Sequence, residues 1–234
     1  MRVIAGTAKG VPIKYPKGAP TRPATELVRG AIFSMLAAAD ADWSRVLDLF
    51  SGSGSLGIEA LSRGAGFVDF VDQDRRCCAI IAENLEKARL ADRAAIHCQD
   101  VSRAIERLDK EAPTPDSPAE APSLPSLRSG ISPTRPHLYP LPKGEENKEG
   151  TANGGEKKAE GTSQYGIVLM DPPYADRAIG EVITRLAGSK LIDEQTFVVI
   201  NHSSRFKLEP SYGALVLKRE IRHGDSVIAV YRKE

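Results

Sequence analysis

The 234-residue chain lacks the features that mark several protein classes. It has only three cysteines, Cys77, Cys78 and Cys98, and none of their spacings matches a paired zinc motif. We therefore expect reduced thiols that serve as small apolar side chains, and no metal site. No apolar run is long enough to span a bilayer, and the first residues lack a signal-peptide pattern. These absences predict a cytoplasmic protein.

One segment departs from an otherwise ordinary composition. Apolar residues make up 41% of the chain and charged residues 27%, which suits a globular domain with its own core. Residues 111–164 are instead rich in Pro, Ser, Gly, Glu and Lys, and they bury too little apolar surface to offset the entropy of ordering. We predict one domain, formed by residues 41–110 and 165–234, with a disordered insertion at 111–164.

Strand-like and helix-like segments alternate outside this insertion. Strands are expected at residues 44–50, 67–71, 94–97, 166–170, 197–200, 214–221 and 227–232. Helices are expected at residues 25–38, 55–63, 74–90, 101–108 and 178–187, with Asp74 as an N-cap. This alternation predicts a Rossmann-like α/β fold, with a mostly parallel seven-stranded sheet and a C-terminal antiparallel hairpin. In such sheets ligands bind beyond the carboxyl ends of the strands.

A glycine-rich loop joins the first of these strands to the next helix. Gly52, Gly54 and Gly57 match the spacing G-x-G-x-x-G, which would serve NAD, FAD or S-adenosylmethionine equally well. Asp72, after the second strand, suits the ribose hydroxyls that all three ligands carry. Asp48 favours S-adenosylmethionine, because its carboxylate would repel a pyrophosphate but could receive the ammonium of a methionine moiety.

The most specific motif is Asp171-Pro172-Pro173-Tyr174, directly after a predicted strand. The two prolines hold the backbone rigid. An exocyclic amine of a purine is a poor nucleophile, because its lone pair is delocalised into the ring. One carboxylate oxygen and one backbone carbonyl that accept its two N–H bonds would localise that lone pair and aim it at a sulfonium methyl group. Tyr174 offers a face for base stacking, worth about 1–3 kcal/mol. The alternative is an incidental Pro-Pro turn.

The first 40 residues are the one clearly polarised region. Glu26 is the only acidic residue up to Gly30, whereas basic residues recur through this stretch: Arg2, Lys9, Lys14, Lys17, Arg22 and Arg29. We predict an N-terminal arm and helix, residues 1–40, that contact RNA phosphates. A solvated surface arm is the alternative.

These motifs together resemble a known family. Residues 46–65 are similar to the cofactor loop of the RsmD-type methyltransferases, and residues 2–10, 21–33, 171–174 and 222–231 match as well. The segment Arg22-Pro23-Ala24-Thr25 discriminates, since generic amino-methyltransferases share only the loop and the Asp-Pro-Pro-Tyr motif. The resemblance implies a class I S-adenosylmethionine-dependent methyltransferase. Its substrate would be the N2 amine of one guanine in 16S rRNA, within a small-subunit ribosomal particle, and we expect a monomer.

The resemblance also implies site residues by position. The cofactor site would comprise Asp48, Phe50, Ser51, Gly52, Ser53, Gly54, Asp72, Gln73, Asp100 and Val101. The catalytic group would be Asp171, Pro172, Pro173 and Tyr174, and the RNA-contacting residues would be Lys9, Lys14, Arg22, Thr25 and Arg29.

Three points stay open at this level. Gln99 and Asp100 could bond the adenine amino group, and Asp100 is equally suited to cap the following helix. The long insertion is atypical of the family. Asn201-His202 stands where the family usually has Glu-His, so any role of that glutamate in orientation or proton removal would be altered here, and His202 could be functional or merely packed.

Other functions compete with this interpretation. A DNA adenine-N6 or protein glutamine methyltransferase would share the catalytic tetrapeptide, although no separate DNA-recognition domain is visible. An NAD-dependent oxidoreductase would use the glycine loop but would leave the Asp-Pro-Pro-Tyr motif without a task. A non-catalytic RNA-binding assembly factor could keep the same fold, and a methyl-transfer assay separates it from the enzymes.

Overall fold

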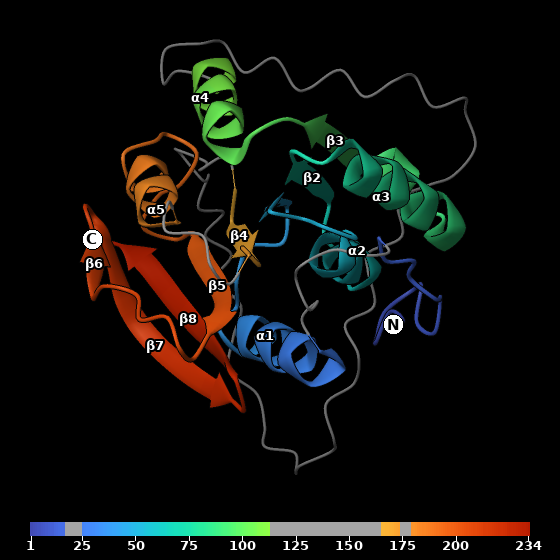
Figure 1. The fold of residues 1–234 in the computed structure, drawn as a ribbon, viewed down its shortest axis with the longest axis horizontal. Coiled ribbons are helices and arrows are strands. Elements are labelled where there is room, and N and C mark those ends of the chain that lie inside the picture. Colours follow the sequence, from blue (N-terminus) through green and yellow to red (C-terminus); the bar gives the residue numbers. More distant parts are fainter. Residues whose placement is uncertain (17–24, 113–164, 174–178) are drawn as a thin grey trace, which may run out of the picture. The chain divides into compact units, whose positions relative to one another are not determined.

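A mixed sheet organises the part of the chain that the computed structural model describes, residues 1–16, 25–112, 165–173 and 179–234. Its eight strands are β1 (Arg45–Leu49), β2 (Phe67–Asp72), β3 (Ala94–Cys98), β4 (Ile167–Met170), β5 (Phe197–Ser203), β6 (Ser211–Tyr212), β7 (Leu215–His223) and β8 (Ser226–Lys233). They pair in the order β3-β2-β1-β4-β5-β8-β7-β6 (Figure 1). β1 to β5 run parallel, whereas β8, β7 and β6 add antiparallel pairings at one edge.

This topology confirms the predicted Rossmann-like sheet with its C-terminal hairpin. The sheet has eight strands rather than seven, because Ser211–Tyr212 pairs with the start of β7. A two-residue strand carries no alternating apolar pattern, so the sequence did not indicate it. β5 also continues to Ser203 instead of ending at Ile200, because its polar last residues pair with β8.

Helices connect the strands and begin at polar caps. They are α1 (Glu26–Ala38), α2 (Ser55–Ser62), α3 (Arg75–Ala88), the short 3₁₀ turn η1 (Ala91–Arg93), α4 (Val101–Glu111) and α5 (Ile179–Ala187). The side chains of Thr25, Asp74 and Asp100 accept backbone N–H groups in the first turns of α1, α3 and α4. α4 takes in Glu111, the first residue of the predicted insertion, and residues 113–164 lie outside the described part. None of the described helices is long and apolar enough to cross a membrane.

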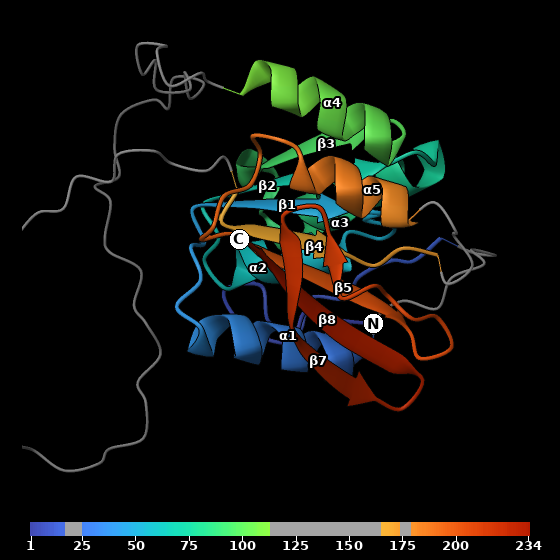
Figure 2. The ribbon, with the colours of Figure 1, turned by 90° about the vertical axis from the view of Figure 1, so that its left-hand side faces the viewer.

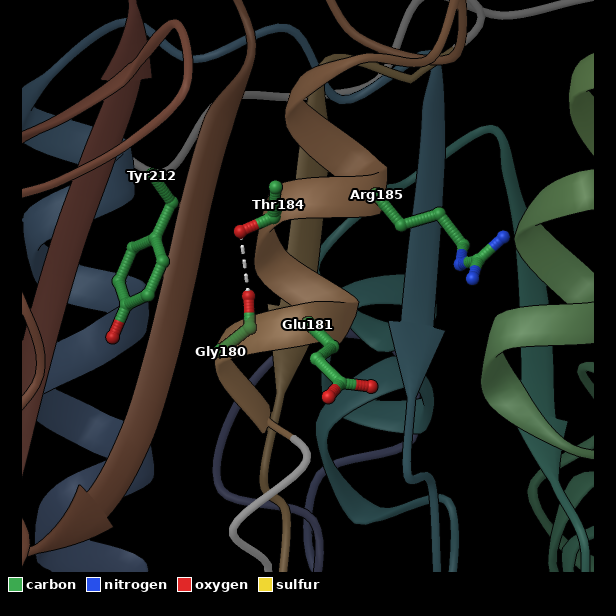
Figure 3. A pocket seen from close by; sticks show the side chains of 5 residues that line it. All are labelled: Gly180, Glu181, Thr184, Arg185 and Tyr212. Atoms are coloured by element: carbon green, nitrogen blue, oxygen red, sulfur yellow. Dashed lines mark hydrogen bonds between the residues drawn. The ribbon is translucent and has the colours of Figure 1, made fainter.

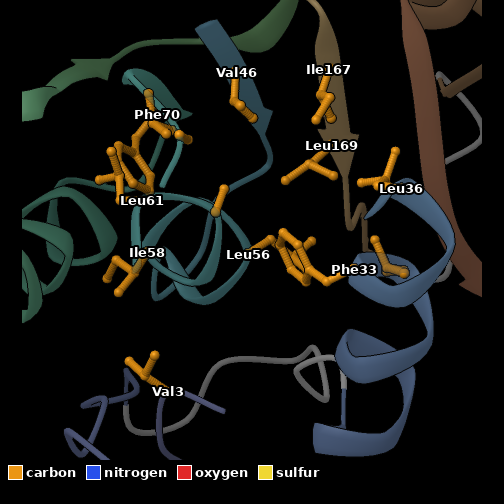
Figure 4. Packing of buried hydrophobic residues seen from close by; sticks show 14 of the residues in the cluster. Val3, Phe33, Leu36, Val46, Leu56, Ile58, Leu61, Phe70, Ile167 and Leu169 are labelled. Carbon is orange, nitrogen blue, oxygen red and sulfur yellow. The ribbon is translucent and has the colours of Figure 1, made fainter. Parts of the chain in front are cut away.

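The sheet is covered on both faces. Successive residues of a strand point to opposite sides, so β1 places Val46 in one apolar cluster and Leu47 and Leu49 in another. Figure 2 shows α4 and α5 on one side of the sheet and α1 on the other. On the second side, Phe33 of α1 lies beside Leu56 of α2 (Figure 4). Two buried faces explain why the central strands read as continuous apolar runs.

The N-terminal segment is docked on α2. The backbone N–H groups of Ile4 and Ala5 donate to the carboxylate of Glu59 at 2.7 and 3.0 Å, and the N–H of Thr7 donates to the carbonyl of Ser62 at 2.8 Å. Glu59 is fully buried. Most of the first 14 residues therefore belong to the folded domain and are not a free solvated arm.

Close backbone approach makes Gly6 the critical residue of this docking. A Cβ at Gly6 would lie 1.8 Å from the Ser62 carbonyl oxygen, whereas Gly10, also at positive φ, has open space around it. We expect Gly6→Ala to lower the free energy of unfolding by roughly 2 kcal/mol or more and Gly10→Ala by about 1 kcal/mol. Urea unfolding of both variants measures this difference. Equal losses would show that the docking does not depend on the close approach.

Candidate functional site

Polar loops gather at the carboxyl ends of the parallel strands. β1 is followed by residues 50–54, β2 ends at Asp72, and β4 is followed by Asp171. The register pairs Asp48 with Leu169, so Asp171 stands two residues further along the neighbouring strand. Two residues of strand place Asp48 and Asp171 on the same face of the sheet, about 7 Å apart along the strand direction.

The three glycines of the G-x-G-x-x-G motif are needed for three different structural reasons. Gly52 has φ +56° and open space where a side chain would project, which leaves its backbone accessible to a ligand. Gly54 has φ +74°, and a Cβ there would press on the side chains of α2 and α3. A Cβ at Gly57 would lie 2.3 Å from the ring of Phe70, so this glycine allows α2 to pack closely on β2. Phe50 also has a positive φ of 58°, which costs strain in a residue with a side chain.

Buried hydrogen bonds hold the loop in place. The N–H of Ser51 donates to the Val71 carbonyl at 3.1 Å, which ties the loop to β2. Asn84 of α3 is 2% exposed, and its Nδ2 donates to the Ser53 carbonyl at 2.9 Å. The same side-chain amide also accepts the N–H of Lys14 and donates to the Lys14 carbonyl. Asn84 thus links the loop to the N-terminal segment. Sequence analysis missed it, although an asparagine among the apolar positions of a helix is itself a signal.

Asp48 is a buried carboxylate with one unused oxygen. Its Oδ2 accepts the N–H of Gly57 at 2.9 Å, while its Oδ1 is buried without a hydrogen-bond partner among the described residues. Burial raises the pKa of Asp48 to about 8, with smaller contributions from the nearby carboxylates of Asp171 and Asp72. A buried acceptor of this kind favours a cationic ligand, because a positive charge would both ionise it and fill its vacant hydrogen-bonding position.

Asp72 is oriented by the backbone. Its Oδ2 accepts the N–H of Gly52 at 2.8 Å, and its Oδ1 accepts the N–H of Asp74 at 2.9 Å. Each oxygen retains a second lone pair that a ribose hydroxyl could donate to. Gln73 beside it is exposed.

The end of β3 contributes a second group of polar atoms. Nε2 of Gln99 is buried and has no partner in the described ranges, so this amide can still donate to a ligand. Asp100 is exposed and caps α4 by accepting the N–H of Arg103 at 3.1 Å, which confirms the capping role. Val101 is buried in the first turn of that helix. A contact from Asp100 to adenine remains a prediction.

The Asp-Pro-Pro corner adjoins β5. Asp171 lies directly after β4, partly buried, with Pro172 buried and Pro173 exposed. Nδ2 of Asn201, at the end of β5, donates to Oδ1 of Asp171 at 2.8 Å. Tyr174, the predicted stacking residue, lies outside the described residues.

The predicted RNA-contacting residues divide into two groups. Lys9, Lys14 and Thr25 are exposed, although the ammonium group of Lys14 pairs with Glu83 and the hydroxyl of Thr25 caps α1. These three can still reach a substrate at the surface. Arg22 lies outside the described residues.

Arg29 requires a correction. Its side chain is fully buried on the inner side of α1, where Nη2 donates to the carbonyl of Arg2 at 2.6 Å. Burial lowers its pKa, and the nearby charge of Glu59 opposes that shift. A side chain without exposed surface does not contact RNA in this conformation, and the Nη2 hydrogen bond instead ties α1 to the N-terminal segment. The prediction from sequence included Arg29 because of its charge. The sequence alone did not show which face of α1 this residue occupies.

A surface hollow lies elsewhere, between α5 and β6. It is lined by Gly180, Glu181, Thr184, Arg185 and Tyr212 (Figure 3). Arg185 is engaged there with Glu106 of α4. None of the predicted site residues lines this hollow. The described residues also contain no group of three or more side chains suited to bind a metal ion.

The raised pKa of Asp48 predicts a pH-dependent stability change in Asp48→Asn. Below about pH 4 the carboxyl is protonated in both folded and unfolded chains, so the variant gains nothing from removing the charge. Between pH 4 and about 8 only the unfolded wild type ionises freely, and wild-type stability falls relative to the variant. We expect the variant's advantage in thermal melting to grow over this window and then level off. The exposed Asp225→Asn is the control, and a flat difference for Asp48→Asn would contradict the assignment.

Known proteins share this sequence and architecture. A family model described as "Conserved hypothetical protein 95" matches residues 1–117 and 139–232. YlbH of Bacillus subtilis, named as a candidate rRNA methyltransferase, is 30% identical over 233 residues, covering 100% of this chain and 99% of that protein. Ribosomal RNA small subunit methyltransferase D of Escherichia coli is 32% identical over 102 residues, 44% of this chain and 51% of that protein.

A solved structure shares the fold as well. The candidate methyltransferase yhhF from Escherichia coli has a TM-score of 0.67 at 22% identity, covering 100% of this chain and 98% of that one. The class I methyltransferase fold expected from the sequence is thereby confirmed. Because the family model spans most of the chain and YlbH aligns along its whole length, the chain belongs to the family described as "Conserved hypothetical protein 95", that of the RsmD-type methyltransferases.

Proposed function

We propose that this chain is an rRNA methyltransferase that transfers a methyl group from S-adenosylmethionine to the N2 amine of one guanine in 16S rRNA. One observation carries the proposal. Asp48 lies on β1 and has a buried oxygen that is unpartnered among the described residues. Asp171 directly follows β4, the strand paired with β1, and the register puts it on the same face of the sheet as Asp48. The proposal would therefore place the site for the cationic donor beside the site for the amine that accepts the methyl group.

The described residues fit S-adenosylmethionine. Oδ1 of Asp48 would receive the ammonium of the methionine moiety, and Asp72 would receive the ribose hydroxyls. The open backbone at Gly52 allows the ligand to approach closely, and Nε2 of Gln99 is a spare donor for the adenine. When bound, the cofactor would supply an electrophilic methyl group on a positively charged sulfur.

Asp171 and the rigid backbone beside it would orient the amine. A carboxylate oxygen of Asp171 and a backbone carbonyl of the Asp-Pro-Pro corner would accept the two N–H bonds, which localises the nitrogen lone pair toward the methyl group. Methyl transfer would form the N–C bond as the C–S bond breaks, and the neutral thioether would be the leaving group. The methylated nitrogen then carries a positive charge and readily loses a proton through its acceptors to water, so a strong general base is not needed. Stacking on Tyr174 remains part of the proposal.

The substrate assignment draws on the relatives and on the N-terminal segment. Both YlbH and the Escherichia coli enzyme carry rRNA methyltransferase names. In this chain, exposed Lys9 and Lys14 lie on the segment that Asn84 ties to the glycine loop, so a bound RNA would lie near the cofactor. Binding as a monomer to a small-subunit particle completes the proposal.

Hypomethylated small ribosomal subunits and labelled S-adenosylmethionine test this function. We expect label on a single guanine of 16S rRNA, located by mapping of the modified base. Label on adenine, on DNA or on a protein glutamine would replace the substrate assignment. The absence of any transfer, with RNA binding retained, would favour an assembly factor.

Asp171→Ala and Asp48→Asn should separate chemistry from cofactor binding. We expect Asp171→Ala to slow methyl transfer by about 100-fold or more while cofactor affinity stays within a few-fold, because the acceptor of the amine is lost. Asp48→Asn should instead weaken cofactor binding, because it removes the charge that faces the ammonium. Calorimetric titration and single-turnover transfer measure the two effects. A parallel loss of both in Asp171→Ala would count against its catalytic role.

A further inference from the structure

Asn201 holds a fixed orientation beside the proposed catalytic carboxylate. It is fully buried at the end of β5, and its Nδ2 donates to Oδ1 of Asp171 at 2.8 Å. An ionised carboxylate only accepts hydrogen bonds, so the amide must turn its NH₂ group toward Asp171. The contact therefore determines which end of the amide remains available.

The oxygen end of the Asn201 amide remains available to accept a hydrogen bond. Oδ1 of Asn201 is buried and has no hydrogen-bond partner among the residues that the structure describes. Buried polar atoms are normally satisfied, and an exception calls for an explanation. A substrate N–H group that enters this part of the site would satisfy the oxygen.

The neighbouring His202 also has an unpartnered buried atom in the described part of the chain, but it does not face the proposed amine site. Nε2 of His202 is also buried and unpartnered within the described ranges. Consecutive residues of a strand face opposite sides, however, so His202 points away from the face shared by Asn201 and Asp171. Its ring packs edge-on against Phe206, with centroids 6.4 Å apart. Asn201 is the residue of this pair that adjoins the proposed amine site.

We propose that Asn201 determines specificity for guanine, with its Oδ1 accepting the N1–H of the target base. Guanine presents an N1–H donor directly beside its N2 amine. Adenine presents an unprotonated N1, which is an acceptor, beside its N6 amine. The two adjacent acceptors, Asp171 and Asn201, match the adjacent N2 and N1 donors of guanine. With adenine in the site, its N1 acceptor would face the Oδ1 acceptor of Asn201, and no hydrogen bond would form. This inference rests on the proposed function and deepens it.

A base analogue removes this contact. 2-Aminopurine keeps the 2-amine but lacks both the N1–H and the O6 of guanine, so variants at position 201 must then assign the effect to the N1–H. We would compare small-subunit particles reconstituted with 16S rRNA that carries either guanine or 2-aminopurine at the mapped position. The wild-type enzyme should show at least a tenfold lower kcat/KM on the 2-aminopurine particle, because a buried acceptor is left unpaired. Equal rates on the two particles would overturn the role of Asn201 while leaving the methyltransferase assignment intact.

Variants at position 201 then test whether Asn201 causes the discrimination between guanine and 2-aminopurine. In Asn201→Ala the ratio of kcat/KM between guanine and 2-aminopurine should fall toward one, whereas the matched control His202→Ala should keep the wild-type ratio. Asn201→Leu, which is closer in volume, replaces Asn201→Ala if melting shows that the alanine variant does not fold. An unchanged ratio in a folded Asn201 variant overturns the inference. No transfer by the wild type to the guanine particle overturns the proposed function, and this inference with it.

Discussion

The buried carboxylate of Asp48 is the constraint around which the site is organised. A charge on a fully buried group destabilises the free protein, and the single N–H of Gly57 offsets only part of that cost. Under the proposed function, a cationic ligand would ionise this acid and fill its second hydrogen-bonding position. Asp48 would then lower stability in the free state and raise affinity for the ligand in the bound state.

The N-terminal segment belongs to this arrangement and is not an independent arm. Glu59 holds its first residues on α2, and Asn84 holds Lys14 while it also holds the carbonyl of Ser53 in the glycine loop. A displacement of the segment would therefore disturb the loop through the Asn84 amide. Exposed lysines on such a segment can contact a polyanion close to the cofactor, which a freely moving arm would not ensure.

Local patterns in the sequence were sufficient for the architecture and for the positions of the polar loops. Apolar runs indicated the parallel strands, and Asp74 was recognised as a helix cap. Side chains whose roles depend on tertiary neighbours were not predictable in this way. Arg29 looked like an RNA contact until its inner position on α1 was known, and Asn84 looked like an ordinary helix residue until the loop carbonyl appeared beside it. The short β6 exists only because β7 pairs with it.

An amide and a carboxylate at position 201 would affect the surrounding charges differently. Burial is the main cause of the raised pKa of Asp48, and repulsion from the nearby carboxylate of Asp171 adds to it. A third carboxylate at position 201 would add repulsion in a buried place and would further disfavour the charged forms of its neighbours in the free protein. An amide avoids this because it donates to Asp171 and still presents an acceptor from its other end. Asparagine therefore orients the carboxylate of Asp171 and presents a second acceptor without adding charge to the proposed site.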